Sequence, residues 1–238
     1  MRIQYAMVLG ITLISTQVFA ADEKLPAVWK GEGELGFIST SGNTATQTLN
    51  AKLKLSNERE KWKHTAIAEG IRALDKNVVT AERYILSGKT DYKFSEVSYI
   101  FGLLKYEDDR FSGYHYQANL IAGYGHKLIK SDRINLAVEV GGGVRRSETL
   151  TNTTSNEGIV YGAMDLGWKV SESAGFNEKL TVESGADSTV TKSVTGLKAK
   201  INSSLASKIT YTIRHVSKVP VGVEKTDREM AITLVYSF

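Results

Sequence analysis

The feature that most constrains this chain is an alternation of apolar and polar residues with a period of two. The last segment shows it clearly: Met230, Ile232, Leu234, Tyr236 and Phe238 are apolar or aromatic, whereas the residues between them are mostly small or polar. Successive side chains of a β-strand point to opposite faces, so this spacing is typical of a strand with one apolar face. The segment is therefore predicted to be such a strand.

The same alternation recurs along most of the chain. Leu49, Leu53 and Leu55 alternate with polar residues, and comparable runs span 114–128, 134–144 and 160–170. Taken together, the runs predict about twelve strands. They lie near 29–39, 45–56, 61–73, 81–94, 97–107, 114–129, 134–146, 158–170, 175–185, 195–206, 208–217 and 227–238.

The connections between these predicted strands alternate in length. The short connections are 57–60, 95–96, 130–133, 171–174 and 206–207. The longer ones are 74–80, 108–113, 147–157, 186–194 and 218–226, while the first, 40–44, is short although it belongs with them. Short turns at one rim and longer loops at the other, with an even number of strands, are typical of outer-membrane barrels. We therefore predict an all-β fold, a transmembrane antiparallel up-and-down β-barrel.

The N-terminus has the pattern of an export signal. Arg2 is the only charged residue among the first twenty, and an apolar run covers 6–14. Val18 and Ala20 then place small residues at the positions that a signal peptidase reads. The apolar run is too short for a membrane-spanning helix, which needs roughly 20 residues. We expect a signal peptide over 1–20, a short periplasmic segment over 21–28, and a barrel over 29–238 in the cell outer membrane.

Composition excludes several classes of protein. Cysteine is absent, which rules out disulfides and thiolate chemistry, and the net charge of +4 gives no nucleic-acid footprint. Only two prolines occur beside 21 glycines, a balance that suits a chain of strands. Mean hydropathy is −0.20, which does not argue against a barrel, because outward apolar residues alternate with inward polar ones.

Aromatic and charged residues distinguish the two faces of the predicted strands. Aromatic residues concentrate near the ends of the apolar faces, where a membrane meets water. They are Trp29, Phe37, Trp62, Tyr84, Phe94, Tyr106, Tyr116, Tyr124, Trp168, Tyr236 and Phe238. Many charged residues share the opposite parity, and isolated charges would be too costly in a dry core. The candidate lumen-lining residues are Lys52, Lys54, Arg83, Glu139, Asp165, Glu183, Lys198 and Lys200. A soluble barrel could instead turn these faces to solvent, but the export signal favours the membrane.

Motifs for catalysis are missing. The sequence holds no G-x-S-x-G, H-E-x-x-H or P-loop, and Gly141–Gly143 lies in an alternating strand, which favours close strand packing or a bend. No histidine has a second histidine at i+2 or i+4. His64 and His215 fall on the outward parity, where a barrel hydrolase would need a neighbouring serine that the sequence does not specify. We expect no enzyme activity and no catalytic, cofactor-binding or metal site.

Several segments resemble an uncharacterised bacterial family of salt-induced outer membrane proteins. Tyr106–Tyr114 is similar to its E-x-D-R-F-S-G segment, and Thr80–Tyr84 to its T-x-E-R-Y segment. Gly123–Leu128 and Gly141–Arg145 match its later glycine-containing stretches. The resemblance covers nearly the whole chain after residue 20 and implies the barrel fold and the outer membrane, but no activity. The ending Tyr236-x-Phe238 also looks like the signal read by the barrel-assembly machinery. The partners expected are that machinery and outer-membrane lipid, with no nucleic acid.

One loop within the resemblance carries a sharper hypothesis. Asp109, Arg110, Phe111 and Gly113 suggest a folded loop that tucks Arg110 against a carboxylate and narrows the channel mouth. The sequence leaves open whether such a loop gates the channel or only helps the chain to fold.

The sequence supports three functions of different kinds. The first is a narrow channel for small hydrophilic solutes, preferentially anions, since about twelve strands lie between filled eight-stranded barrels and open sixteen-stranded porins. The second is a non-conducting structural or stress-response protein of the envelope. The third, less favoured, is an outer-membrane hydrolase. Conductance separates the first from the second, and lipid or peptide turnover would reveal the third.

Overall fold

The computed structural model describes residues 29–39, 46–76, 78–110, 112, 114–219 and 224–238. These residues form twelve strands, whose bounds follow. They are β1 (Trp29–Ser39), β2 (Thr46–Glu58), β3 (Trp62–Asp75), β4 (Val78–Lys93), β5 (Ser98–Asp109), β6 (Tyr114–Lys130), β7 (Ile134–Thr149), β8 (Thr154–Lys169), β9 (Ala174–Gly185), β10 (Thr189–Lys200), β11 (Leu205–Val216) and β12 (Thr226–Ser237). The predicted signal peptide and the segment 21–28 lie outside the described residues.

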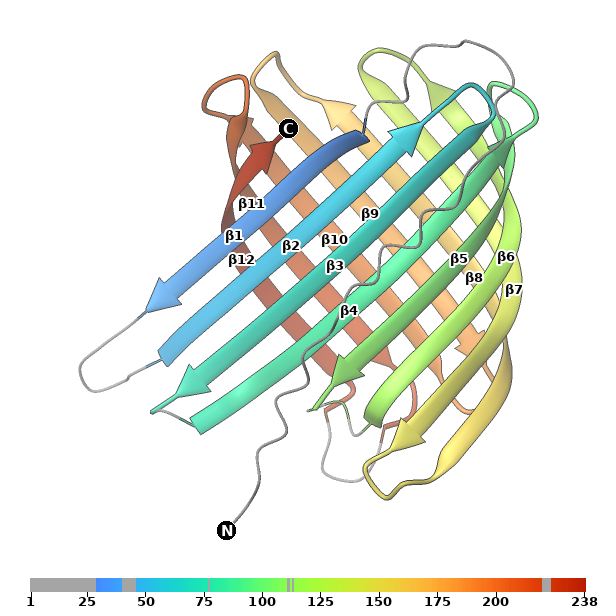
Figure 1. The fold of residues 1–238 in the computed structure, drawn as a ribbon, viewed down its shortest axis with the longest axis vertical. Coiled ribbons are helices and arrows are strands. Elements are labelled where there is room, and N and C mark those ends of the chain that lie inside the picture. Colours follow the sequence, from blue (N-terminus) through green and yellow to red (C-terminus); the bar gives the residue numbers. More distant parts are fainter. Residues whose placement is uncertain (1–28, 40–45, 77, 111, 113, 220–223) are drawn as a thin grey trace, which may run out of the picture.

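The strands form one closed antiparallel barrel. Each strand pairs with its neighbours in sequence, and β1 pairs with β12 to close the ring. Figure 1 shows the strands steeply tilted around a common axis, with the start of β1 and the end of β12 at the same rim. Within the described residues no helix is long and apolar enough to cross a membrane. The predicted all-β barrel of about twelve strands is confirmed.

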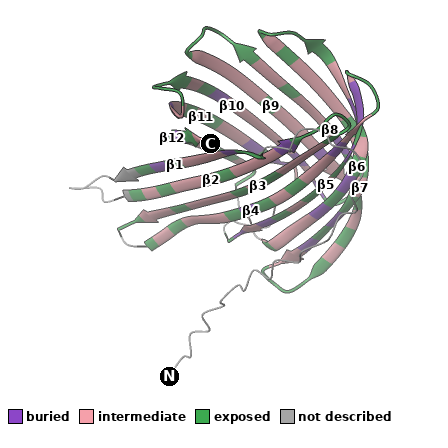
Figure 2. Cartoon of the chain, turned by 45° about the horizontal axis from the view of Figure 1, so that its top comes forward, coloured by how far each residue is buried: buried purple, intermediate pink, exposed green. Residues whose placement is uncertain are grey.

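The outer face of the barrel is apolar. Exposed and less exposed residues alternate along the strands, as Figure 2 shows. Leu35, Leu104 and Leu120 are each 59% exposed. Water-soluble proteins rarely expose leucines to this extent across a whole face of a sheet. Such a continuous apolar belt is the surface that a barrel presents to lipid hydrocarbon.

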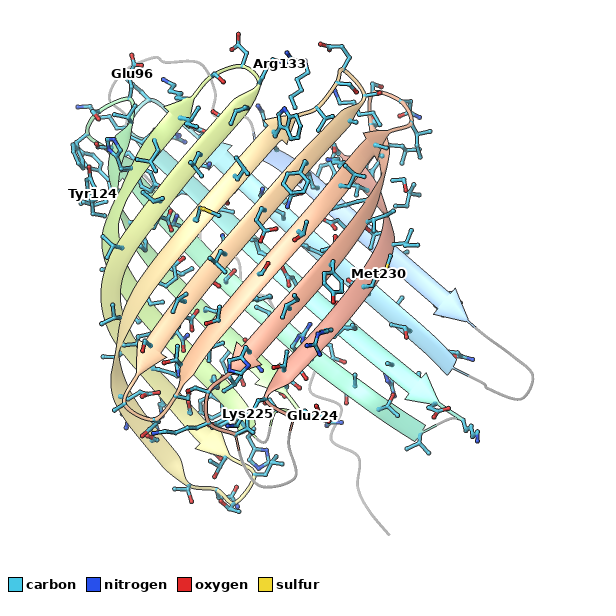
Figure 3. The ribbon with its side chains drawn as sticks, turned by 180° about the vertical axis from the view of Figure 1, so that it is seen from behind. Glu96, Tyr124, Arg133, Glu224, Lys225 and Met230 are labelled. Atoms are coloured by element: carbon cyan, nitrogen blue, oxygen red, sulfur yellow. The ribbon has the colours of Figure 1, made fainter. Side chains whose placement is uncertain are left out.

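Aromatic side chains border this belt as the sequence predicts. Trp62 packs on Tyr92 with ring centroids 4.9 Å apart, and Tyr106 stacks on Tyr116 at 5.7 Å. Figure 3 places Tyr124 at the outer edge of the barrel below the rim that carries Glu96 and Arg133. Amphipathic rings at such positions anchor a barrel at the two interfaces of a membrane.

Several strand ends differ from the prediction. The expected turn at 206–207 lies inside β11, and the chain instead turns at 201–204, where Asn202 Oδ1 accepts the backbone N–H groups of Ser204 and Leu205 at 2.9 and 2.8 Å. Asparagine followed by two serines is ordinary turn chemistry, which the continuing alternation concealed. The loops expected at 147–157 and 186–194 shrink to 150–153 and 186–188, because strand pairing continues through polar residues. The contrast between the two rims is therefore smaller than predicted.

The closure between β1 and β12 is the shortest pairing in the barrel. Its register covers four residue pairs, from Glu32–Ser237 to Leu35–Leu234, whereas every other strand pair joins at least ten. Phe238 extends the closure at the rim: its backbone exchanges hydrogen bonds of 2.7 and 2.9 Å with Gly31. The Phe238 ring also covers Gly31 on the outer face and stacks on Tyr236 at 5.8 Å. The two residues of the predicted assembly signal thus lie at the closing seam.

Candidate functional site: the barrel lumen

Contacts between strands that are not neighbours identify the residues that face the lumen. Lys198 of β10 lies 2.6 Å from Glu32 of β1, although β11 and β12 separate the two strands. Arg83 of β4 lies 2.6 Å from Glu229 of β12, across three intervening strands. Side chains can meet in this way only inside the barrel. The alternation of the sequence therefore separates a lipid-facing surface from a charged lumen.

The lumen half away from the termini is crossed by a network that we call the ion-pair belt. Its members are Arg83, Lys105, Arg145 and Arg214 with Glu107, Glu157, Glu183 and Glu229. Lys105 Nζ lies 3.3 Å from Glu107 and 3.4 Å from Glu183, so it joins two carboxylates. Four cations face four carboxylates, which makes the belt neutral and explains how buried charges are tolerated there.

Arg145 is the most enclosed member of the belt. The residue is only 2% exposed. Its guanidinium donates to Glu157 at 3.1 Å, to the Ser188 hydroxyl at 3.0 Å and to the Glu183 carbonyl at 3.1 Å. A buried guanidinium needs several hydrogen-bond acceptors, and its planar shape directs its N–H donors toward them at fixed angles. Arg145 thereby ties β7 to β8, to β9 and to the turn at 186–188.

A cluster of apolar side chains occupies the lumen next to strands β5, β6 and β8. Tyr99, Phe101, Ile121, Ile159 and Tyr161 are all buried and pack together. Glycines on the next strand make room, because a Cβ on Gly125 would fall on the Tyr99 ring. The hydroxyls of Tyr99 and Tyr161 donate to Glu139, which also pairs with Lys89.

This cluster is not among the features predicted from the sequence. Apolar residues on both faces of 99–101, opposite glycines at 123 and 125, are the signal that could have revealed it.

The lumen opening at the rim of the termini is strongly basic, and we call it the termini-side mouth. Two pockets of about 350 and 450 Å³ lie there. Their cationic lining residues are Lys30, Lys54, Arg133, Lys169, Lys198 and Lys200, and their acidic ones are Glu32, Asp132 and Glu172. Lys198 pairs with Glu32 at 2.6 Å and Lys169 with Glu172 at 2.8 Å. Six cationic side chains and three acidic ones give the mouth an excess of positive side-chain charge.

The candidate lumen-lining residues divide among these regions. Lys54, Lys198 and Lys200 line the termini-side mouth, and Lys54 and Lys200 have no carboxylate within 4 Å among the described residues. Arg83 and Glu183 belong to the belt. Lys52 pairs with Glu69 at 2.6 Å, and Glu139 is bonded to Lys89 and to two tyrosines. Asp165 lies opposite Lys179 in the β8–β9 register. The prediction groups them on one face but does not foresee their partners.

The candidate loop motif is arranged differently from the hypothesis. Arg110 does meet a carboxylate, since its Nη1 lies 2.6 Å from Glu82. Glu82 shares its parity with the lipid-facing Tyr84, whose hydroxyl bonds to it at 3.1 Å, and the Arg110 side chain is 70% exposed. The pair therefore lies on the outer side of the rim and does not narrow the mouth. Asp109 is buried, its carbonyl accepting from the Ser112 hydroxyl at 2.8 Å, while Phe111 and Gly113 fall outside the described residues.

One serine–histidine contact appears on the outer face, which the sequence did not indicate. Ser98 Oγ lies 3.0 Å from His126 Nδ1, and the Tyr124 hydroxyl contacts both, at 3.0 and 3.2 Å. Ser98 is buried, and no carboxylate is bonded to His126 among the described contacts. His64 and His215 contact threonine hydroxyls, at 3.1 and 2.9 Å. In the part of the chain that the structure describes, no group of residues is arranged to hold a metal ion.

Known proteins share both the sequence pattern and the fold. The chain is 26% identical over 212 residues to the uncharacterized protein YdiY of Escherichia coli (strain K12), covering 88% of this chain and 83% of that protein. Among solved structures, the NanC porin matches with a TM-score of 0.56 at 10% identity, over 88% of this chain and 98% of the porin. The COG4313 outer membrane channel from Pseudomonas putida F1 matches with a TM-score of 0.53 at 10% identity, over 93% and 100%.

These likenesses identify the fold as that of outer-membrane barrels. The sequence also matches a family model. The model of the family described as "Protein of unknown function, DUF481" covers residues 33–238, nearly the whole described barrel. The motifs of 80–84, 106–114 and 141–145 all lie within that range. The chain belongs to the DUF481 family.

Proposed function

We propose that the protein is an outer-membrane channel that passes small hydrophilic solutes and prefers anions. The observation that carries the proposal is the excess of cationic side chains at the termini-side mouth, six against three acidic side chains. Fixed positive charge around a narrow opening raises the local concentration of anions and lowers that of cations. The apolar outer belt and the aromatic borders support insertion in a membrane, and the shared fold supports the outer membrane.

A second function has its own observation in favour. The neutral ion-pair belt and the apolar cluster occupy much of the lumen, and a barrel filled in this way would serve the envelope without conducting. Belt side chains such as Lys105 and Arg214 are held at 3.3–3.6 Å from their partners, and the ion pairs would have to open or be bypassed during passage. Conduction decides between the two functions.

The test is the reversal potential of the refolded protein in a planar bilayer with a salt gradient. We expect an anion preference in the unmodified chain. The double variant Lys54→Glu with Lys200→Glu should weaken or reverse it, because both lysines line the mouth without a paired carboxylate.

The variant Lys130→Glu is the matched control. Lys130 lies beside the turn at the same rim and pairs with Glu96 at 2.9 Å outside the pockets, so the preference should hardly change. Absence of conductance at every voltage would overturn the channel and favour the non-conducting envelope function. Cation preference in the unmodified protein would overturn the proposed anion preference.

A further inference from the structure

A third pocket lies deep inside the lumen, beside the closing seam. Its volume is about 80 Å³, enough for a few water molecules or for one ion of the size of chloride or acetate. Residues from β1, β2, β3, β4, β10, β11 and β12 line it, so it lies between opposite parts of the barrel wall. The pocket is separate from the termini-side mouth and shares no lining residue with it.

The charges around this pocket do not balance. Each of its three carboxylates has a cation of its own: Glu34 pairs with Lys208 at 2.9 Å, Glu69 with Lys52 at 2.6 Å, and Glu229 with Arg83 at 2.6 Å. The fourth cation is Lys192, which forms no ion pair within 4 Å among the described residues. The charged groups that act on it from farther away are Glu69, Glu107, Lys105 and Arg83, two of each sign. One positive charge is therefore left over in an enclosed place.

A hydrogen-bond donor without a partner lines the same pocket. Thr233 is 5% exposed, and its Oγ1 has no hydrogen-bond partner among the described residues. A buried hydroxyl without a partner costs free energy, because it has given up its hydrogen bonds to water. A buried ammonium without a counterion also costs free energy, because it loses its hydration. Both deficits are relieved by one group that is negatively charged and accepts hydrogen bonds.

We propose that this pocket binds one small monovalent anion, a carboxylate or a halide, between Lys192 and Thr233. The ammonium of Lys192 supplies the charge and the Thr233 hydroxyl donates a hydrogen bond. The other lining cations keep their own carboxylates and take no part in neutralising the anion. The site deepens the proposed anion channel, since it places one binding station within the lumen. It can be tested without any measurement of conduction.

The experiment uses the full refolded chain in detergent with chloride as the probe. Chloride NMR line broadening, titrated with acetate as competitor, should show saturable binding. Lys192→Gln should weaken binding at least about ten-fold, because it removes a charge-assisted bond. Thr233→Val, which keeps the side-chain shape, should weaken it less. Lys130→Gln is the matched control: it removes the same charge at the rim, outside the mouth and the deep pocket, and should leave the saturable component in place.

Folding is checked by heat-modifiable migration on gels, and Lys192→Arg should keep the binding that Lys192→Gln loses. If Lys192→Gln does not fold, Thr233→Val and Lys192→Arg carry the test. No saturable broadening in the unmodified protein, or equal binding in Lys192→Gln, would overturn the site. Chloride binding without conductance would overturn the proposed channel and support the anion site. Conductance without chloride binding would support the channel and overturn the anion site.

Discussion

Replacing Ile209 with arginine should prevent most of the protein from folding into a membrane. Ile209 lies in the middle part of β11, is 41% exposed, and pairs with Leu197 and Ile232 on the outer face. An arginine near the centre of the hydrocarbon costs roughly 2–4 kcal/mol in barrels. The folded fraction, measured by heat-modifiable migration after refolding into lipid vesicles, should fall accordingly.

Thr210→Arg is the matched control, at the same depth on the opposite face. Thr210 lines the deep lumen pocket, and its cross-strand neighbours Gly196 and Ala231 are small, although the Asn177 side chain lies over Gly196. This variant should refold nearly as well as the unmodified chain. If Thr210→Arg abolished folding and Ile209→Arg did not, the assignment of the two faces of β11 would be inverted.

The variant Gly143→Ala should also destabilise the barrel strongly. A Cβ at this position would collide with the backbone of β6, at the Leu120 oxygen and the Ile121 Cα. Backbone atoms cannot move aside as a flexible side chain can, so we expect a loss of about 1–3 kcal/mol or more from overpacking. Urea unfolding in vesicles should show a lower midpoint with an unchanged slope.

Gly142→Ala tests the same triplet without the collision. Gly142 faces outward, and the nearest atom to a Cβ there would be the Ile159 carbonyl oxygen at 3.4 Å, an ordinary contact. Its stability should stay within about 0.5 kcal/mol of the unmodified protein. Equal effects of the two substitutions would show that the close approach of β6 and β7 does not explain the glycines at 141 and 143.

The faces of the strands follow from the sequence more reliably than their ends. Alternation assigns Leu49 and Leu53 to the outside and Lys52 and Lys54 to the inside, because the period of a strand is local and unambiguous. Strand ends beyond the apolar belt have no such signal. Pairs such as Ser147–Ser155 and Glu148–Thr154 continue the ladder with polar residues on both strands, so they resemble a loop in sequence.

The ion-pair partners of the lumen residues, unlike the faces of the strands, cannot be predicted from the sequence. Arg83 and Glu229 are 146 positions apart, and only the curvature of the closed barrel brings them within 2.6 Å. Arg145 likewise reaches Ser188 and Glu183 along the inner surface of the barrel, past β8. A sequence can assign such residues to one face but not to one another. The sequence predicts a carboxylate partner for Arg110 but does not identify it, because Glu82 belongs to a different strand.

One side of each strand faces lipid and the other faces a charged lumen. The chain has no cysteine, so single cysteines carrying a spin label can be placed along β2 from Thr48 to Ser56 in the refolded protein in lipid vesicles. Oxygen accessibility should peak at Leu49, Leu53 and Leu55, and accessibility to a polar relaxant at Lys54 and Ser56, which line the termini-side mouth. Oxygen and relaxant maxima at the same positions, or a pattern without a period of two, would contradict the account.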